Sequence, residues 1–382
     1  MSQQPGSSPS ISRRSLLVIA LSGVTGCGGG GTGGSSLSLS PGTGGTGLFA
    51  QGSITGFGSV ILNAIRFDDT AAAVQIDGLS ASSLDLRLGM VAQVQGQRGT
   101  DVTLGIAKVI EVWSIAQGVV SQVQAGQFKV AGMLVQTDAA TVLDGISTAS
   151  SLSNGMRVAI WGLQSGADGN RWTATRIALV SAATPLVSTG IVTASTTLNG
   201  LALTGQKATG LVAGQLVRVQ GVLSSSGGSL QVDSATVLDL QNGNLPQGDA
   251  EIEGLVTALL SGSRFMLGNV EVDASSASLA ASYKALALGQ RIEVEGVWQG
   301  KVLKAVLFEV ENEQKLDEAE IEAKIEQFTS LDNFVIRGQR CNASTARISK
   351  GVAGDLKVGV KVKLTGTKAG DVLMVTTLEI ES

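Results

Sequence analysis

Histidine is absent from the 382-residue chain, and charged and aromatic residues are scarce, at 15% and 3%. Without imidazole there is no Ser-His-Asp triad, no Cys-His pair and no histidine-ligated metal. The two cysteines, Cys27 and Cys341, are too few and too far apart for a zinc ribbon or a disulfide framework. The net charge of −4 offers no basic surface to nucleic acid. We therefore expect no metal, no cofactor and no nucleic-acid partner.

The remaining reactive groups do not form a recognisable catalytic site. No serine lies in a G-x-S-x-G elbow, and there is no D-x-D-x-D-G calcium loop. The acids at 68–69 and the 8 acids within 309–326 are expected on solvated surface. Cys341 has Arg337 and Arg340 nearby, a setting that lowers a thiol pKa. An isolated strand cysteine is nevertheless more often a small packing residue. We expect the protein not to be an enzyme.

The first 27 residues predict an export signal. Arg13 and Arg14 form a charged head, an uncharged apolar stretch covers 16–24, and small residues precede Cys27. Residues 15–26 are too short to cross a hydrocarbon core of about 30 Å at 1.5 Å per residue. Both a general secretory signal and a twin-arginine signal fit the paired arginines.

A tether is expected after this signal. Residues 28–48 contain 10 Gly together with Ser, Thr and one Pro. Such a segment buries too little apolar area to offset its conformational entropy, so it should remain a flexible coil. Its ends are expected about 25 Å apart on average.

One octapeptide pattern, bounded by glycines, recurs five times and defines an internal repeat. The five copies are Gly89–Gly96, Gly155–Gly162, Gly214–Gly221, Gly289–Gly296 and Gly359–Gly366. Strands alternate faces, so the third and fifth positions after the first glycine share one side. These positions are always apolar: Ala92/Val94, Val158/Ile160, Val217/Val219, Ile292/Val294 and Val362/Leu364. The octapeptide therefore predicts a half-buried strand whose bounding glycines suit turns or bulges.

Other strand patterns surround each octapeptide. An opening segment precedes it, at Gly52–Ile54, Gly118–Val120, Gly190–Val192, Gly254–Val256 and Ala323–Ile325. A closing strand follows it, beginning at Ala107, Ala174, Ala235, Ala305 and Thr376. Two or three further strand-like runs lie between, as at 128–130 and 133–135. Five short strands per copy indicate a small closed β barrel or sandwich.

The predicted domain organisation is a row of small modules. After the signal (1–27) and the tether (28–48) come copy 1 (50–114), copy 2 (115–182), copy 3 (186–241), copy 4 (249–311) and copy 5 (319–382). Residues 311–327 are rich in helix formers, so a short helix is expected over about 312–319. The opening strand of copy 5 is then expected from Glu320.

The N-terminal signal ending in Cys27, the Gly/Thr tether, the segment 52–61 (GSITGFGSVI) and Ile65–Asp68 resemble a family of proteobacterial lipoproteins. These proteins are built from tandem copies of a domain catalogued only as a domain of unknown function. The resemblance covers about 50–382 and implies five tandem, five-stranded OB-like β barrels at the cell envelope. It also implies a lipid on Cys27, and Gly28 after it favours the outer membrane. It carries over no catalytic residue.

We expect a non-enzymatic structural or protein-interaction scaffold, anchored to the membrane through Cys27. The alternative is a glycan-binding envelope protein. OB-type barrels stack sugars on exposed aromatics, which makes Trp161, at an outward octapeptide position, and Trp298 the candidate ligand contacts. The scaffold hypothesis needs no such side chain.

Overall fold

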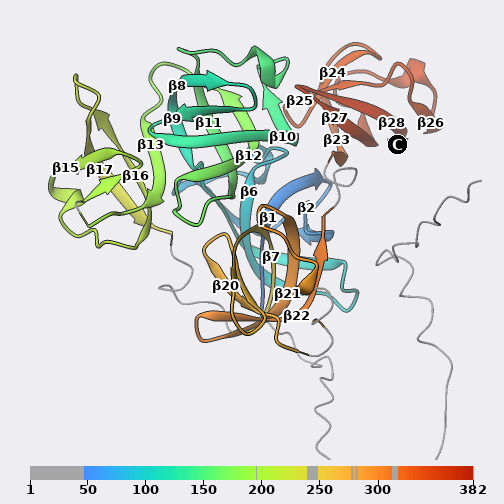
Figure 1. Ribbon diagram of the computed structural model, residues 1–382. Helices are drawn as coiled ribbons and strands as arrows, with labels where there is room; N and C mark the ends of the chain where they lie inside the picture. Colours follow the sequence, from blue (N-terminus) through green and yellow to red (C-terminus); the bar gives the residue numbers. More distant parts are fainter. Residues whose placement is uncertain are drawn as a thin grey trace, which may run out of the picture. The chain divides into compact units, whose positions relative to one another are not determined.

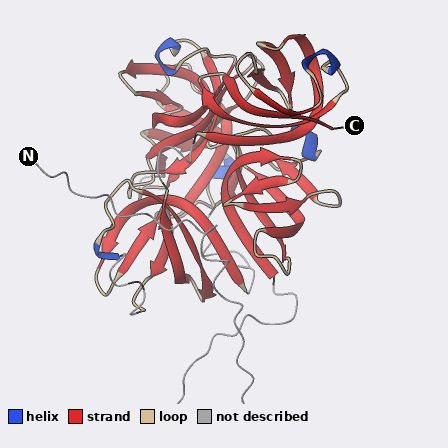
Figure 2. Ribbon diagram, turned by 90° about the vertical axis from the view of Figure 1, so that its right-hand side faces the viewer, coloured by secondary structure: helices blue, strands red, loops and turns tan. Residues whose placement is uncertain are grey.

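The computed structural model describes residues 47–381, except for 195, 239–247, 277–278, 280–282 and 312–316. It is all-β: Figure 2 shows strands throughout, with only short helical turns. The expected flexible tether overlaps the first strand, which begins at Gly47. Residues 312–316 of the expected helix lie outside the described part, and its last two residues belong to a strand that begins at Glu318. Within the described part of the chain, no helix has the length and hydropathy needed to span a membrane.

Two of the copies are closed five-stranded barrels (Figure 1). Copy 2 contains β8 (Ala116–Gln124), β9 (Gln127–Val130), β10 (Met133–Asp144), η2 (Ala149–Ser151), β11 (Arg157–Gln164) and β12 (Arg171–Leu179). Its pairings run β8–β9–β10–β12–β11 and return to β8. Copy 4 contains β18 (Asp249–Leu260), β19 (Arg264–Leu267), β20 (Val270–Asp273), β21 (Arg291–Gln299) and β22 (Val302–Val310). Its pairings close in the same order.

The other copies contribute further strands. Copy 1 contains β1 (Gly47–Phe57), β2 (Val60–Leu62), β3 (Ile65–Asp68), β4 (Ala73–Ile76), β5 (Leu79–Ala81), η1 (Ser83–Asp85), β6 (Val91–Arg98) and β7 (Leu104–Val112). Copy 5 contains β23 (Glu318–Ser330), β24 (Asn333–Ile336), β25 (Gln339–Asn342), β26 (Arg347–Lys350), η4 (Ala353–Asp355), β27 (Lys361–Ala369) and β28 (Val372–Glu381). Their main strands follow the same pairing order as copies 2 and 4.

Copy 3 keeps this order, except that no strand pairing among the described residues joins its first two strands. It contains β13 (Leu186–Ile191), β14 (Thr197–Leu198), β15 (Leu201–Thr204), η3 (Gln206–Ala208), β16 (Leu216–Leu223) and β17 (Ser229–Val237). Among the described residues, which exclude the neighbouring residue 195, β14 pairs with β15 alone.

The first glycine of every octapeptide lies in the same turn. Its φ is positive in all five copies, between 76° and 93°. The following residue donates to the carbonyl two residues before the glycine, as Met90 N does to Arg87 O at 3.2 Å. A type II turn needs positive φ at its third position, which glycine adopts without strain. The glycine amide also donates to the opening strand, as Gly89 N does to Ile54 O at 2.9 Å. Equivalent bonds recur at Gly155, Gly214, Gly289 and Gly359.

The second glycine lies at a β-bulge in every copy. The register between the octapeptide strand and the closing strand shifts at Gly96, Gly162, Gly221, Gly296 and Gly366. At each of these glycines a Cβ would overlap a carbonyl oxygen of the closing strand. The prediction that the bounding glycines form turns and bulges is therefore confirmed, with one role for each glycine.

Gly221→Ala should destabilise copy 3. Its Cβ would overlap the carbonyl oxygen of Gln231, and forcing packed strands apart costs about 1–3 kcal/mol. Gly228→Ala is the matched control in the same copy, because no described atom lies within 4 Å of its added Cβ. Thermal denaturation of both variants measures the difference. Equal melting temperatures would show that the bulge does not require glycine.

The predicted inward side of the octapeptide strand is correct in all copies. All ten inward side chains named above are 0% exposed. The third residue of each opening segment is also buried: Ile54, Val120, Val192, Val256 and Ile325. Alternation along one strand thus sets the core of every copy.

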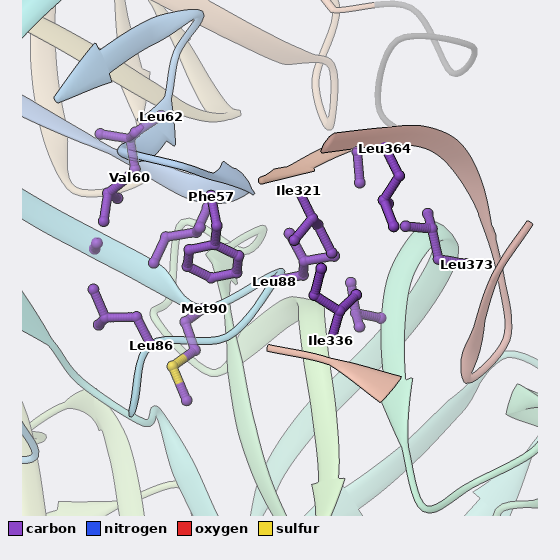
Figure 3. Packing of buried hydrophobic residues seen from close by; sticks show 14 of the residues in the cluster. Phe57, Val60, Leu62, Leu86, Leu88, Met90, Ile321, Ile336, Leu364 and Leu373 are labelled. Atoms are coloured by element: carbon purple, nitrogen blue, oxygen red, sulfur yellow. The ribbon is translucent and has the colours of Figure 1, made fainter. Parts of the chain in front are cut away.

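The copies do not form a simple row in which each contacts only its neighbours. β1 of copy 1 pairs in parallel with β18 of copy 4, from Leu48↔Asp249 to Gln51↔Ile252. It also pairs in parallel with β23 of copy 5, at Gly56↔Glu320. Figure 3 shows part of a buried cluster that includes Phe57 of copy 1 and Ile321 of copy 5. Copies distant in sequence therefore share hydrogen-bonded strands and apolar packing.

Candidate functional site

The sequence-predicted site residues have different outcomes. Arg13, Arg14 and Cys27 lie outside the described residues. Trp161 and Trp298 are only 6% and 4% exposed, so the expectation that they face solvent as ligand contacts is wrong. The chain has 4 Trp, 1 Tyr and 8 Phe, all within the described residues, and every one of these side chains is buried or partly buried. There is no exposed aromatic on which a sugar or base could stack.

The two tryptophans are buried for different physical reasons. Trp298 belongs to the core of copy 4, with Phe265 and Leu303. Trp161 does not join the core of its own barrel; it lies in the cluster that contains Leu88 and Met90 of copy 1. Its octapeptide position is outward as predicted, but another copy covers it. Exposure cannot be inferred from an outward position alone.

Cys341 lies in the core of copy 5, where its thiol is inaccessible. Cys341 is 0% exposed, and burial raises the pKa of its thiol. The guanidiniums of Arg337 and Arg340 do not offset this burial. Among the described residues, no group of three or more Cys, Asp or Glu side chains could hold a metal ion. The thiol is therefore a packing group.

Two of the hollows on the described surface lie on or beside copy 4. The larger, about 560 Å³, lies along β18–β20, where Arg264 pairs with Glu271 at 2.9 Å and Asp273 at 3.7 Å. The smaller, about 220 Å³, is lined by uncharged residues of copies 2, 3 and 4, including Gln164 and Met266. The two carboxylates that line the larger hollow thus share one guanidinium.

Several buried charged side chains pair with one another where the copies meet. Glu253 of copy 4 is 6% exposed and accepts hydrogen bonds from Ser53 of copy 1, from N at 2.6 Å and Oγ at 2.8 Å. Arg291, also buried, lies 3.3 Å from Glu253 and donates to Asp138 of copy 2 at 3.1 Å. A buried charge without a partner costs several kcal/mol, so this chain of contacts specifies how three copies meet.

Lys368 of copy 5 approaches the same junction. Its Nζ donates to Ala140 O of copy 2 at 3.3 Å. Burial, and after it the charge of the nearby Arg291, lower the pKa of Lys368 to about 8 against the opposing effect of Asp317, Glu253 and Asp138. Four copies thus contribute charged or polar groups at this place.

Lys368 should make stability depend on pH above about 8. The folded protein releases this proton before the unfolded chain does, whose lysine pKa is near 10.4. The unfolded state then binds more protons, so the free energy of unfolding rises with pH between these values. Lys368→Met should remove this part of the rise. Urea denaturation of both proteins at pH 7, 8, 9 and 10 measures it, and parallel pH profiles would contradict the assignment.

A second junction involves Arg218 of copy 3. Its octapeptide position faces away from the core of its own copy, yet the side chain is 4% exposed. It pairs with Asp77 of copy 1 at 2.9 Å and donates to Ser114 O at 2.8 Å. It also lies over the ring of Trp113, 5.3 Å from the centroid. An acidic substitution at Arg218 would therefore be costly, contrary to what its outward position implies.

Other arginines join further pairs of copies. Arg176 of copy 2 is 3% exposed, donates to Leu88 O of copy 1 at 3.0 Å and pairs with Asp144. Arg98 of copy 1 pairs with the fully buried Glu251 of copy 4 at 2.8 Å. Arg337 of copy 5 lies over the ring of copy 1's Phe57 at 4.2 Å. The planar guanidinium can pair, cap a carbonyl and stack at once, which suits such junctions.

Two segments of the chain match one family model. It is described as a domain of unknown function (DUF5666), and the matched residues are 117–178 and 253–306. These segments lie in copies 2 and 4, the two closed barrels. The part of the predicted resemblance that concerns a repeated domain of unknown function is thereby confirmed. A search of curated proteins found no match.

Proposed function

We propose that the protein is a bacterial envelope lipoprotein whose five copies are OB-like barrels and act together as a non-enzymatic scaffold for protein interaction. The signal with Arg13 and Arg14 exports the chain. A lipid on Cys27 anchors it, and residues 28–46 separate the modules from the membrane, in our proposal the outer membrane.

The contrast between frame and outer surface carries this proposal. The turn glycine, the bulge glycine and the inward apolar pair are the same in all copies. The outward octapeptide side chains differ: Gln93/Gln95, Ala159/Trp161, Arg218/Gln220, Glu293/Glu295 and Lys363/Thr365. Three of them, Ala159, Trp161 and Arg218, are buried against other copies. The glycines and inward residues that build each copy are constant, while the outward residues vary and some of them already make contacts between copies. This combination suits a protein-interaction module.

The glycan-binding alternative has less support. Stacking on exposed aromatics is the usual means by which OB-type faces hold sugars, and the described residues offer no exposed aromatic side chain. No lining residue of the two hollows is aromatic.

Site-specific crosslinking in the producing cells tests the scaffold function. A photo-reactive residue at Leu79, Val222 or Val352, which are 73%, 64% and 63% exposed, should yield discrete protein adducts. The unchanged chain, irradiated in the same way without a photo-reactive residue, is the control and should yield no adduct. Adducts at none of the exposed positions, together with tryptophan quenching by envelope glycans, would overturn the scaffold proposal in favour of glycan binding.

A further inference from the structure

The turn before each octapeptide has a second role in copy 1. Leu88, directly before the turn glycine, is 2% exposed and lies in one buried cluster with Ala159, Trp161 and Ala178 of copy 2. The Leu88 carbonyl accepts a hydrogen bond from Arg176 of copy 2 at 3.0 Å. Copy 2 therefore covers this turn with apolar contacts and with a hydrogen bond to its carbonyl.

The turn glycine of copy 1 also serves this contact. A Cβ on Gly89 would overlap Thr175 O of copy 2 and lie 2.8 Å from Val142 Cγ2. The absence of a side chain lets the turn reach the outer surface of β12. Gly89 is thus required both for its positive φ and for its close approach to copy 2.

Copy 4 has the same turn, but no other copy packs against it among the described residues. The sequences are Leu86-Arg-Leu-Gly89 in copy 1 and Leu286-Ala-Leu-Gly289 in copy 4. Leu286 is 7% exposed and fills its barrel as Leu86 does, but Leu288 is 66% exposed. No described atom lies within 4 Å of a Cβ added to Gly289. The residue that copy 1 buries against copy 2 is exposed to solvent in copy 4.

We propose that the copy 4 turn 286–289 is a docking element for the outer strand face of a further β module, supplied by a partner protein. This inference deepens the proposed scaffold function and rests on it. The partner face has the chemistry of copy 2: two small residues paired across neighbouring strands, and beside them an aromatic paired with an arginine that caps the carbonyl before the glycine. The partner is a separate protein because copy 1 already occupies the one such face among the described residues of this chain.

The copy 2 face itself can serve as the probe. The bait is a chain with Leu88→Asp and Leu288→Asp. Leu88→Asp should displace the copy 1 turn from the copy 2 face, because an unpaired buried carboxylate is costly. Leu288→Asp removes the exposed leucine from the bait's own copy 4 turn. Bait and prey both carry Cys27→Ser so that no lipid contributes. Surface plasmon resonance should detect binding of the otherwise unchanged chain to this bait and at least tenfold weaker binding of a Leu288→Asp prey.

Two controls keep the test decisive. A Leu79→Asp prey loses an equally exposed leucine elsewhere, at 73% exposure, and should bind as the unchanged chain does. A Gly89→Ala/Leu288→Asp bait opens the same face by steric overlap with Thr175 O, in case Leu88→Asp unfolds copy 1. Absence of binding to a folded bait, or equal loss with Leu79→Asp and Leu288→Asp, would overturn the docking element. Crosslinked adducts at the other exposed positions would then still support the scaffold.

Discussion

Val219→Asp is expected to unfold copy 3. Val219 is 0% exposed and belongs to a small core with Val217, Leu230 and Val232. An uncompensated buried carboxylate costs roughly 3–5 kcal/mol. At about 0.05–0.15 kcal/mol per residue, a unit of around 50 residues has only about 3–8 kcal/mol to lose. Limited proteolysis should therefore cut this variant first within 186–237.

Val222→Asp is the matched control, because it places the same side chain in the same strand at a position that is 64% exposed. It should cost less than about 0.5 kcal/mol. Equal sensitivity of the two variants to protease would refute the strand register. Arg218 is unsuitable as an outward control, since its guanidinium is buried between Asp77 and Ser114.

The unfolding of copy 3 should also reach its direct neighbours. Loss of Arg218 removes the ion-pair partner of Asp77, and loss of β13 removes the contact from Ser188 Oγ to Ala131 O at 2.9 Å. Hydrogen exchange should therefore rise at the copy 1 turn that holds Asp77 and at the β9–β10 hairpin of copy 2. The pairing of β1 with β18 involves no residue of copy 3 and should remain protected.

The repeat frame could be predicted from the sequence because its causes are local. A glycine with positive φ, a glycine at a bulge and alternate apolar residues leave a pattern within eight positions. One more local signal was present: a leucine stands three residues before the first glycine in every copy, at Leu86, Leu152, Leu211, Leu286 and Leu356. It is buried or, at Leu211, partly buried against the core of its own copy, and it extends the repeat pattern toward the N-terminus.

The junctions could not be predicted, because they depend on contacts between distant copies. Nothing within an octapeptide distinguishes Gln95, which is exposed, from Arg218 or Trp161, which other copies bury. The parallel pairing of β1 with β18 joins residues about 200 positions apart. Burial of an outward residue therefore identifies a junction only once the copies are placed together.

Cys27→Ser should move the protein from the membrane fraction to the soluble fraction of exported protein. If the proposed lipid on Cys27 is the anchor, its loss removes the whole attachment, because burying acyl chains gives about 0.8 kcal/mol per CH₂. No described helix offers a replacement. Fractionation followed by detection of the mature chain measures this, and an all-or-none change is expected rather than a partial shift.

Cys341→Ala is the control for the loss of a thiol, since Cys341 is fully buried in copy 5 and cannot accept a lipid while folded. This variant should remain in the membrane fraction until detergent is added. A Cys27→Ser protein that still required detergent would show that another part of the chain binds the membrane. Cys27→Ser leaves every described contact of the copies unchanged. Its effect therefore separates anchoring through the Cys27 sulfur from membrane binding by the folded copies themselves, and Cys341→Ala shows that loss of a thiol alone does not release the protein.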